Sequence, residues 1–492
     1  MTWKKHWYQE AGALELLRLA IPLILSSSFL TLQLFVDRVL LSQSSHEAIA
    51  ASMPAAAVYW TAIMFLQYTA NYATTFVAQY VGAGRPERVG PSVWQSLYFS
   101  VLGGLGFFAL LPLAEPLFRM IGHAAAVQEQ EILYLRCLCF AALPALIVAS
   151  VNSFFAGRGE TWIVAVIDAT GMTINAVLAY ALIFGHWGLP EMGIRGAGWA
   201  TVIGSAVSAL LGLALFFQAK YRARFGTLSG WRFDPELFRR MMRFGLPNGV
   251  QAMLDGLSFT VFLSLLGRIG EDQLAASNIA FAINIVGLLP MLGMGQAVGV
   301  VVGQRLGQDR PDLATRSTWM GFWMALVYIS AGVLLYVLAP GACMYFFRNE
   351  RDPNWAHVAE LVPVLLRFVA VYSLFDTMNI VFSFALRGAG DTRFVTIVSL
   401  FLAWPIMVLP TWAAWKFGWG LYWAWGFASA YVIALGITFL LRFQAGKWKS
   451  MRVIERTRPG MSVDGQVLGQ TGQEQKSEVP PANNASILEA TN

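Results

Sequence analysis

The sequence AQYVGAGRPE at residues 78–87 returns as GQRLGQDRPD at residues 303–312. Gln79 and Gln304 hold the same place in the two copies, at an offset in numbering of 304 − 79 = 225. A segment that returns far along the chain indicates an internal repeat, which constrains the fold more strongly than a local pattern does. The chain therefore contains two similar halves.

Three further pairs of segments extend the repeat over most of the chain. Two keep the same offset (247 − 22 = 225), namely Leu19-Ala-Ile-Pro22 with Phe244-Gly-Leu-Pro247 and Ala50-Ala-Ser52 with Ala275-Ala-Ser277. The third pair, Gly159-Glu-Thr161 with Gly390-Asp-Thr392, has a slightly larger offset (390 − 159 = 231). Because the anchors keep their order while the offset drifts slowly, a chance match is a poor explanation.

The composition indicates that lipid surrounds both halves. Of the 492 residues, 57% are hydrophobic and 13% are charged, and the mean hydropathy is +0.56. A helix needs about 20 mostly apolar residues to cross a bilayer. Twelve stretches meet this requirement, at residues 14–41, 52–80, 92–117, 130–155, 161–184, 194–218, 243–267, 277–303, 317–340, 360–386, 393–416 and 420–443. We therefore predict an all-α polytopic membrane protein with six transmembrane helices in each half.

The basic residues gather in alternate loops and at the two ends of the chain. This set comprises Lys4, Lys5, Arg85, Arg88, Arg158, the run 220–243, Arg305, Arg310, Arg316, Arg387, Arg393 and the cluster 447–458. By the positive-inside rule these segments face the cytoplasm, so both termini are cytoplasmic and the number of spans is even. The net charge of +6 is thus accounted for by membrane topology, and we expect no nucleic-acid partner.

The repeat and the topology together give a domain plan. Because six spans separate corresponding residues, both halves have the same orientation and are related by a pseudo-two-fold axis along the membrane normal. We predict an N-terminal lobe at 1–220, a cytoplasmic linker loop at 221–240, a C-terminal lobe at 241–445 and a tail at 446–492 that is first basic and then disordered. This architecture puts a cavity between the lobes. No removable signal peptide is evident from Met1 to Tyr8, so the first helix is expected to act as the insertion signal.

No pattern in the chain indicates a cofactor or a structural metal. The cysteines Cys137, Cys139 and Cys343 lie in or beside apolar segments and lack the spacing of a zinc site or a disulfide framework. No glycine-rich loop followed by Lys-Ser/Thr is present, and the five histidines fall near span ends or in loops. We therefore do not expect an enzyme or an ATP-driven pump.

Four acidic residues, Asp37, Asp168, Asp255 and Asp376, fall within the predicted spans. A charged carboxylate at the bilayer centre costs at least about 2.5 kcal/mol, so something must offset that cost. Asp168 lies close to the basic loop at Arg158, and we interpret it as a snorkelling side chain or as part of a pair that holds helices together. It is left out of the predicted site.

Asp255 and Asp376 are predicted to lie at one depth in the C-terminal lobe. Arg243 lies twelve residues before Asp255, and Arg387 lies eleven residues after Asp376. At 1.5 Å per residue, both carboxylates then lie about 16–18 Å from the cytoplasmic boundary, near the midplane of a ~30 Å core. A shared proton or a transiently bound Na⁺ would relieve their repulsion and burial cost. Their repeat mates are Leu30 and Ala145, so the two acids are not part of the common scaffold.

Other polar residues could complete this site or could simply pack. Tyr372 lies four residues before Asp376, hence on the same helical face, where it supplies a phenolic oxygen or merely fills space. Four amides are further candidates for a substrate cavity, although each could instead bond a neighbouring helix: Gln251, Asn278, Asn284 and Asn379.

A second cation site is possible in the N-terminal lobe. Asp37 lies near the outer boundary of the first span with Arg38 beside it, which is also typical of an interfacial ion pair. Asn175 and Thr201, on the fifth and sixth spans, offer hard oxygen ligands at a similar depth. Both interpretations remain open at this point.

The motifs together resemble the MATE (multidrug and toxic compound extrusion) family, in particular its NorM-like bacterial branch, over residues 10–445. The matching pieces are Leu-Ala-Ile-Pro22, Val-Asp37, Ala-Gln79-Tyr-Val-Gly-Ala-Gly84, Gly193-Ile-Arg-Gly-Ala-Gly-Trp-Ala-Thr201, Val302-Gly-Gln-Arg-Leu-Gly307 and Leu386-Arg-Gly-Ala-Gly-Asp-Thr392. The resemblance implies a two-lobed transporter of a bacterial inner membrane that exports small cationic amphipathic drugs in exchange for Na⁺ or H⁺, and we expect it to act as a monomer.

The resemblance also implies roles for particular residues. Tyr372 and Asp376 match the family's tyrosine and aspartate on span ten, and Asp255 stands where the family has a glutamate on span seven. Asp37 and Asn175 match positions of a cation site in the amino-terminal lobe, whereas the acidic or amide position four residues after Asn175 is Ala179 here.

Two other transporter classes compete with this interpretation. A flippase for lipids or lipid-linked oligosaccharides in the same superfamily would need a cationic cavity, for which Arg367 and Arg387 are the candidates, although both fall near span ends. A twelve-span facilitator-type carrier usually has an Asp- and Arg-rich loop after its second span, and this chain has Gly82-Ala-Gly-Arg-Pro-Glu87 there.

Overall fold

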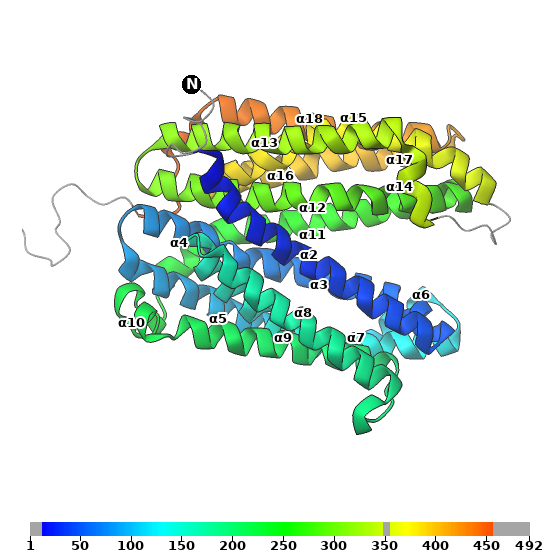
Figure 1. Cartoon of the computed structure of the whole chain (residues 1–492), viewed down its shortest axis with the longest axis horizontal. Coiled ribbons are helices and arrows are strands. Elements are labelled where there is room, and N and C mark those ends of the chain that lie inside the picture. The colour runs from blue at the N-terminus through cyan, green and yellow to red at the C-terminus, as the bar shows by residue number, and fades with distance from the viewer. Residues whose placement is uncertain (1–11, 348–354, 456–492) are drawn as a thin grey trace, which may run out of the picture. The chain divides into compact units, whose positions relative to one another are not determined.

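The long apolar segments of the sequence form helices that are long enough to cross a bilayer. The computed structural model describes residues 12–347 and 355–455; within them, eleven helices reach this length and one bent pair of helices completes a set of twelve spans (Figure 1). The described part of the chain contains no strand. The predictions for Met1 to Tyr8 and for the tail after Arg458 lie outside the described residues.

The helices of the first half are α2 (Ala13–Ser44), α3 (His46–Asn71), α4 (Ala73–Gly82), α5 (Val89–Phe107), α6 (Leu110–Ile121), α7 (Ala125–Gly157), α8 (Thr161–Phe184) and α9 (Ile194–Phe216). Those of the second half are α11 (Pro235–Ile269), α12 (Glu271–Gly307), α13 (Pro311–Leu338), α14 (Pro340–Met344), α15 (Trp355–Ala389), α16 (Thr392–Leu402), α17 (Leu409–Lys416) and α18 (Leu421–Gln444). The short helix α10 (Ala219–Phe225) stands between the halves, and single turns lie at Pro86–Arg88, His186–Gly188, Ser229–Trp231, Tyr345–Phe347 and Lys447–Ser450.

The predicted linker at 221–240 is partly helical. Besides the end of α10, it contains the start of α11 at Pro235, well before the predicted span begins at Arg243. Asp234 caps this helix because its side chain accepts a hydrogen bond from the backbone N–H of Leu237 at 3.0 Å. Proline is favoured at the first helical position, where its missing N–H has no partner to lose.

Proline explains the irregularities of the third and the eleventh predicted spans. The third span bends by 50° where α5 ends at Phe107 and α6 begins at Leu110. The ring of Pro112 would clash with the carbonyl of Phe108 in a continuous helix, and Gly106 weakens the helix just before the break. In the eleventh span the segment Ala403–Val408, which contains Pro405, forms a π-helical turn between α16 and α17. Such a turn accommodates the missing backbone hydrogen bond.

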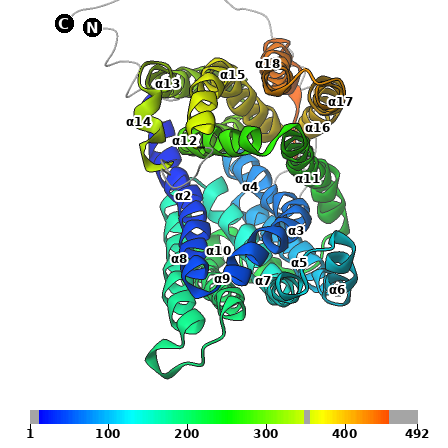
Figure 2. The same ribbon diagram turned by 90° about the vertical axis from the view of Figure 1, so that its right-hand side faces the viewer.

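The two halves form two helical bundles, which we call the N-lobe (α2–α9) and the C-lobe (α11–α18) (Figures 1 and 2). Between them, α2 packs on α12 while α11 packs on α3. In the repeat, α2 corresponds to α11 and α3 corresponds to α12. The first helix of each lobe therefore packs against the second helix of the other lobe. This reciprocal packing is the pseudo-two-fold relation that the repeat predicts.

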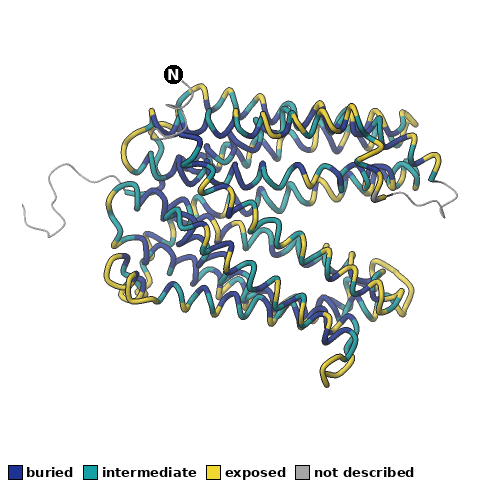
Figure 3. Tube along the Cα trace, viewed as in Figure 1, coloured by how far each residue is buried: buried dark blue, intermediate teal, exposed yellow. Residues whose placement is uncertain are grey.

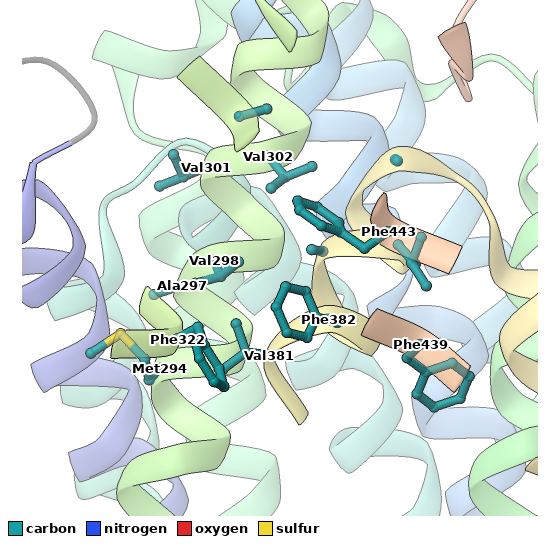
Figure 4. Packing of buried hydrophobic residues seen from close by; sticks show 14 of the residues in the cluster. Met294, Ala297, Val298, Val301, Val302, Phe322, Val381, Phe382, Phe439 and Phe443 are labelled. Atoms are coloured by element: carbon teal, nitrogen blue, oxygen red, sulfur yellow. The ribbon is translucent and has the colours of Figure 1, made fainter. Parts of the chain in front are cut away.

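Each lobe has an apolar interior and an apolar exterior. In the C-lobe, Val298, Phe322, Phe382 and Phe439 pack together (Figure 4). The same cluster includes side chains from α2. Burial is concentrated where helices face one another (Figure 3). On the outer faces large apolar side chains are exposed, Val327 for example at 72%. Exposed apolar surface of this kind suits a protein whose solvent is lipid.

A reciprocal pair of hydrogen bonds joins the lobes at one end, which we call the closed end. Gln79 Nε2 on α4 donates to the carbonyl oxygen of Gly388 at 3.0 Å, and Gln304 Nε2 on α12 donates to that of Gly157 at 2.9 Å. Gln79 and Gln304 are repeat mates, and so are Gly157 and Gly388, which keep the larger offset (388 − 157 = 231). Toward the opposite end, which carries α6 and α14, the two bundles diverge (Figure 1).

Two glycines allow the backbones to meet at the closed end. A Cβ added at Gly82 would lie 2.0 Å from the carbonyl oxygen of Gln304, and one added at Gly307 would lie 2.2 Å from that of Gln79. These two glycines are repeat mates as well, since 307 − 82 = 225. Because the opposing atoms are backbone, no side chain can move aside to make room.

A Gly307→Val variant is therefore expected to push the lobes apart at the closed end. Spin labels on cysteines introduced at the exposed positions Glu87 and Gln308, with the three native cysteines replaced, should report a mean distance several ångström longer than in the parent. Gly426→Ala is the matched control, because a Cβ there meets nothing within 4 Å. An unchanged distance in the valine variant would refute this account of the closed end.

Candidate functional site

The C-lobe contains a cavity of about 530 Å³ that is lined by α11, α12, α15, α16 and α18, by Met407 of the π-helical turn and by two residues of α3. We call it the C-lobe cavity. Its polar lining consists of Tyr68, Asn248, Gln251, Asp255, Ser258, Asn284, Tyr372, Asp376, Asn379, Ser383, Arg387, Ser399 and Tyr431. Both carboxylates that the sequence analysis selected therefore face one cavity. Both also lie within electrostatic reach of the hydroxyl of Tyr431.

Asp255 lies on α11 among donors from two helices. Gln251, one turn earlier, places its amide nitrogen 3.4 Å from Asp255 Oδ2 and 3.0 Å from the hydroxyl of Ser399 on α16. The Arg387 guanidinium on α15 adds an electrostatic attraction. The carboxylate of Asp255 is thus held by one amide and faces one positive charge.

Asp376 lies on α15 and is held by a neutral amide. Its Oδ1 accepts a hydrogen bond from Asn379 Nδ2 at 2.9 Å. Tyr372, one turn earlier, accepts a hydrogen bond from Asn284 Nδ2 on α12 at 3.1 Å. Since the phenol accepts from Asn284, its own O–H remains a donor for a neighbouring oxygen.

Arg387 was predicted near a span end, and its guanidinium in fact lines the C-lobe cavity. It lies 5.1 Å from the centre of the Phe384 ring, and its Nε has no hydrogen-bond partner among the described residues. A signal was present in the sequence, because the eleven residues from Asp376 to Arg387 make about three helical turns and put both side chains on one face.

The predicted amides divide into two groups. Gln251, Asn284 and Asn379 line the C-lobe cavity. Asn278, on the same helix as Asn284, is exposed and does not line it. A separation of six residues corresponds to about 600° of helical rotation, so the two side chains point to different sides of the helix.

In the N-lobe, Asp37, Asn175 and Thr201 come together from α2, α8 and α9. Asp37 is 5% exposed and Asn175 is 1% exposed, and the two side chains are close enough to interact electrostatically. Asn175 Nδ2 also donates to Thr201 Oγ1 at 3.1 Å. By contrast, Arg38 is exposed, so the carboxylate of Asp37 faces the protein interior.

Two oxygens at this N-lobe cluster are without partners. Asp37 Oδ1 and Asn175 Oδ1 are both buried and make no hydrogen bond to any described residue. Together with the hydroxyl of Thr201 they offer a carboxylate, an amide and a hydroxyl oxygen, a donor set that suits a proton or a hard monovalent cation. Ala179 is fully buried and adds no oxygen.

Asp168, which is not part of the predicted site, lines a cavity of the N-lobe. Its carboxylate accepts hydrogen bonds from Ser26 on α2 and from Asn152 on α7. Asp168 therefore holds three helices together and does not snorkel toward the membrane surface. However, it also faces open space. The spacing contained a hint, since Asp168 and Asn175 are seven residues apart and share a face of α8.

Comparisons with known proteins cover most of the chain. The family model MatE matches residues 22–181 and 247–412, two segments whose starts keep the offset of the internal repeat (247 − 22 = 225). The multidrug resistance protein PmpM of Pseudomonas aeruginosa is 30% identical over 399 residues, which cover 80% of this chain and 82% of that protein. The multidrug resistance protein NorM of Burkholderia vietnamiensis is 30% identical over 438 residues, covering 88% and 93%.

Solved structures of lower identity share the fold. A multidrug resistance MATE family transporter of the MOP superfamily in an outward-facing conformation superposes with a TM-score of 0.81 at 21% identity, covering 92% of this chain and 99% of that chain. A MOP superfamily transporter from Pyrococcus furiosus gives a TM-score of 0.82 at 21% identity, with the same coverage. The two-lobed arrangement of twelve spans is therefore that of a known transporter fold.

Proposed function

The chain belongs to the MatE family, and from that premise we propose that it exports cationic, amphipathic organic compounds across a bacterial inner membrane in exchange for Na⁺ or H⁺. The observation that carries the proposal is the pair of carboxylates, Asp255 and Asp376, in one cavity within the membrane. Two carboxylates at such depth need a compensating cation or proton. Since one chain lines the whole cavity, the monomer would suffice for transport.

The orientation in the membrane follows from the charges at the closed end. The segments at this end contain Arg85, Arg158, Arg310 and, in the last turn of α12, Arg305. The positive-inside rule assigns them to the cytoplasm. Both termini would then be cytoplasmic. Because the lobes meet at this end and diverge at the other, the arrangement supports an outward-facing state.

Coupling would arise from mutual exclusion at the carboxylates. An organic cation and a coupling ion seek the same negative charge, and one carboxylate pair in a site of low dielectric constant does not compensate both. Each ligand therefore lowers the affinity of the other by the same factor. Binding of the ion on one side and of the organic cation on the other would then move them in opposite directions.

The N-lobe cluster around Asp37 would act as a second place for the coupling ion. An Asp37→Asn variant is expected to slow ion-driven efflux roughly tenfold, the scale of one lost charged contact, because the C-lobe carboxylates remain. Efflux in proteoliposomes at graded ion concentrations would measure this. Arg38→Gln is the control, since that neighbour is exposed. A wild-type rate in Asp37→Asn would remove this cluster from the mechanism.

Arg387 is the observation that favours the flippase alternative, since a guanidinium in the cavity attracts an anionic headgroup. The balance of charges opposes it, because the C-lobe cavity holds two carboxylates against this one guanidinium. Competition distinguishes the two functions. An anionic and a neutral phospholipid headgroup analogue would each be tested for displacement of a bound cationic dye. Equal displacement by the two analogues would support efflux of cations.

Efflux from cells tests the proposed function. Cells without other efflux pumps would be loaded with ethidium, and its loss would be followed with the chain expressed and with the sodium or the proton gradient collapsed separately. The proposal expects expression-dependent efflux that one of the two treatments abolishes. Efflux that continues whichever of the two gradients is collapsed would contradict the proposal, and so would the absence of any efflux that depends on expression.

A further inference from the structure

Near the closed end, α11 and α16 form a pocket that shares no residue with the C-lobe cavity. We call it the arginine pocket. Its lining contains Arg239, Arg240 and Arg243 on α11, Arg393 on α16 and, among the described residues, one acidic residue, Glu236. The lining therefore has a net charge of 4 − 1 = +3. Because Glu236 already pairs with Arg240 at 2.7 Å, the other three arginines are left to attract an anion.

Arg239, Arg243 and Arg393 lack acidic partners within the described part of the chain. None of them makes an ion pair or a hydrogen bond with another described residue, and Arg243 contacts the ring of the next residue at 5.9 Å from its centre. Other arginines of the protein are paired, for example Arg305 and Arg442, each with a carboxylate oxygen at 2.7 Å. Three unpaired guanidinium groups around one pocket repel one another, so a bound anion would stabilise them.

The faces of α11 and α16 that carry these arginines become apolar farther along each helix. On α11, Leu246 and Leu257 follow on the same face and are exposed. On α16, Ile397 and Phe401 follow Arg393 at intervals of four residues and are exposed as well, Phe401 at 68%. A charged pocket is thus continuous with an apolar surface, which suits a ligand that has an anionic head and hydrocarbon chains.

This apolar surface faces lipid and not the C-lobe cavity. Leu257 and Asp255 are two residues apart on α11, which corresponds to about 200° of helical rotation, and Asp255 lines the C-lobe cavity. The arginines also stand at the bilayer boundary, because the predicted spans at 243–267 and 393–416 each begin with one of them. The arginine pocket therefore lies at headgroup depth on the outside of the C-lobe.

Hydrogen bonds hold α11 and α16 together beside the arginine pocket. Thr396 Oγ1 on α16 donates to the carbonyl oxygen of Pro247 on α11 at 2.8 Å. One turn farther, Gln251 Nε2 on α11 donates to Ser399 Oγ on α16 at 3.0 Å. The arginines are thus carried by two helices that are tied to each other, and little ordering is needed when a ligand binds.

We propose that the arginine pocket binds the phosphate of an anionic phospholipid, in the cytoplasmic leaflet if the chain has the orientation given above. Arg239, Arg243 and Arg393 would surround the phosphate, and the acyl chains would lie along the apolar faces of α11 and α16. Guanidinium groups suit phosphate because they donate two parallel N–H bonds, and basic pockets between membrane helices bind such headgroups. The lipid is a resident ligand of the outer surface, so this inference goes beyond the proposed transport function.

Native mass spectrometry of the full chain in detergent tests this site. The probes are dioleoylphosphatidylglycerol, which is anionic, and dioleoylphosphatidylcholine, which has the same chains and no net charge. We expect the wild type to bind the anionic lipid at least about tenfold more tightly. Arg239→Gln combined with Arg243→Gln should weaken that binding roughly thirtyfold, the scale of two arginine contacts with anionic lipid. Lysine at both positions keeps the charge without the planar fork and should retain part of the affinity.

The matched control is Arg222→Gln combined with Arg224→Gln, which removes two exposed arginines of α10 outside the arginine pocket. It should bind the anionic lipid as the wild type does, whereas equal losses in the two glutamine pairs would reduce the effect to net charge and overturn the site. Soluble glycerol 3-phosphate should bind far more weakly than the lipid, since it lacks acyl chains.

Two further outcomes would overturn the lipid site. One is equal binding of the anionic and the neutral lipid by the wild type, a comparison that requires no variant and so decides even if a variant misfolds. The other is binding of glycerol 3-phosphate as tight as that of the anionic lipid, which would make the arginine pocket a site for soluble phosphates.

Discussion

A double variant, Asp255→Asn with Asp376→Asn, is expected to lose ion-driven efflux by roughly 100-fold or more, the product of two lost charged contacts. The amides keep nearly the same shape, and Gln251 and Asn379 can still donate to their oxygens, so the C-lobe cavity should keep its packing. What the variant loses is the negative charge for which the coupling ion and the organic cation compete. Ethidium transport into everted membrane vesicles under an imposed gradient would measure the loss.

The matched control for the double variant is Glu47→Gln, which removes a carboxylate that is exposed on α3. Its efflux rate should equal that of the wild type. Thermal unfolding of both variants in detergent would show whether the C-lobe remains intact. Efflux at the wild-type rate in a stably folded double variant would exclude these two carboxylates from coupling.

An Arg387→Gln variant is expected to bind the coupling ion more tightly and to transport more slowly. The Arg387 guanidinium attracts Asp255, so it acts as an internal cation that a bound ion must compete with. In a partly buried site such an attraction amounts to about 1–2 kcal/mol, so its loss should lower the half-effective ion concentration for dye displacement roughly tenfold. Slower release of the ion would then lower the maximal efflux rate.

Arg393→Gln is the matched control for this prediction, because Arg393 is an exposed arginine at the start of α16, outside the C-lobe cavity. Dye displacement from the purified protein at graded Na⁺ concentration and at graded pH would give the half-effective values. A half-effective concentration in Arg387→Gln that equals that of the wild type would mean that the guanidinium does not compete with the ion.

The fold was largely predictable because the chain repeats itself. Anchors such as Gln79 and Gln304 lie in two copies of one pattern, and the apolar runs have the length that a bilayer imposes. Irregularities were harder to predict, since the bend near Phe108 arises from a proline four residues later that the hydropathy pattern does not register. The early start of α11 depends on the cap by Asp234, which is a local signal within a segment that looks like a polar loop.

A site residue could be predicted where its depth within a span was sufficient evidence. It could not be predicted where its role depends on the direction in which its side chain points. Asp255 and Asp376 stand out because a carboxylate deep in a span is costly at any rotation of the helix. The environment of Asp168 depends on which side chains face it across α2 and α7, and that information lies in the packing. Likewise, the position of Arg387 in the chain places it at the end of a predicted span. Its long side chain nevertheless lines the C-lobe cavity.

The central claim is that the chain exchanges an organic cation for Na⁺ or H⁺ through competition at Asp255 and Asp376. Its most direct test is ethidium movement in proteoliposomes that contain only this chain, driven in turn by a sodium gradient and by a proton gradient. The account predicts uphill ethidium transport under one gradient, movement of that ion in the opposite direction when an ethidium gradient is imposed, and neither in the double variant. Ethidium that merely equilibrates, whichever gradient is applied, would contradict it.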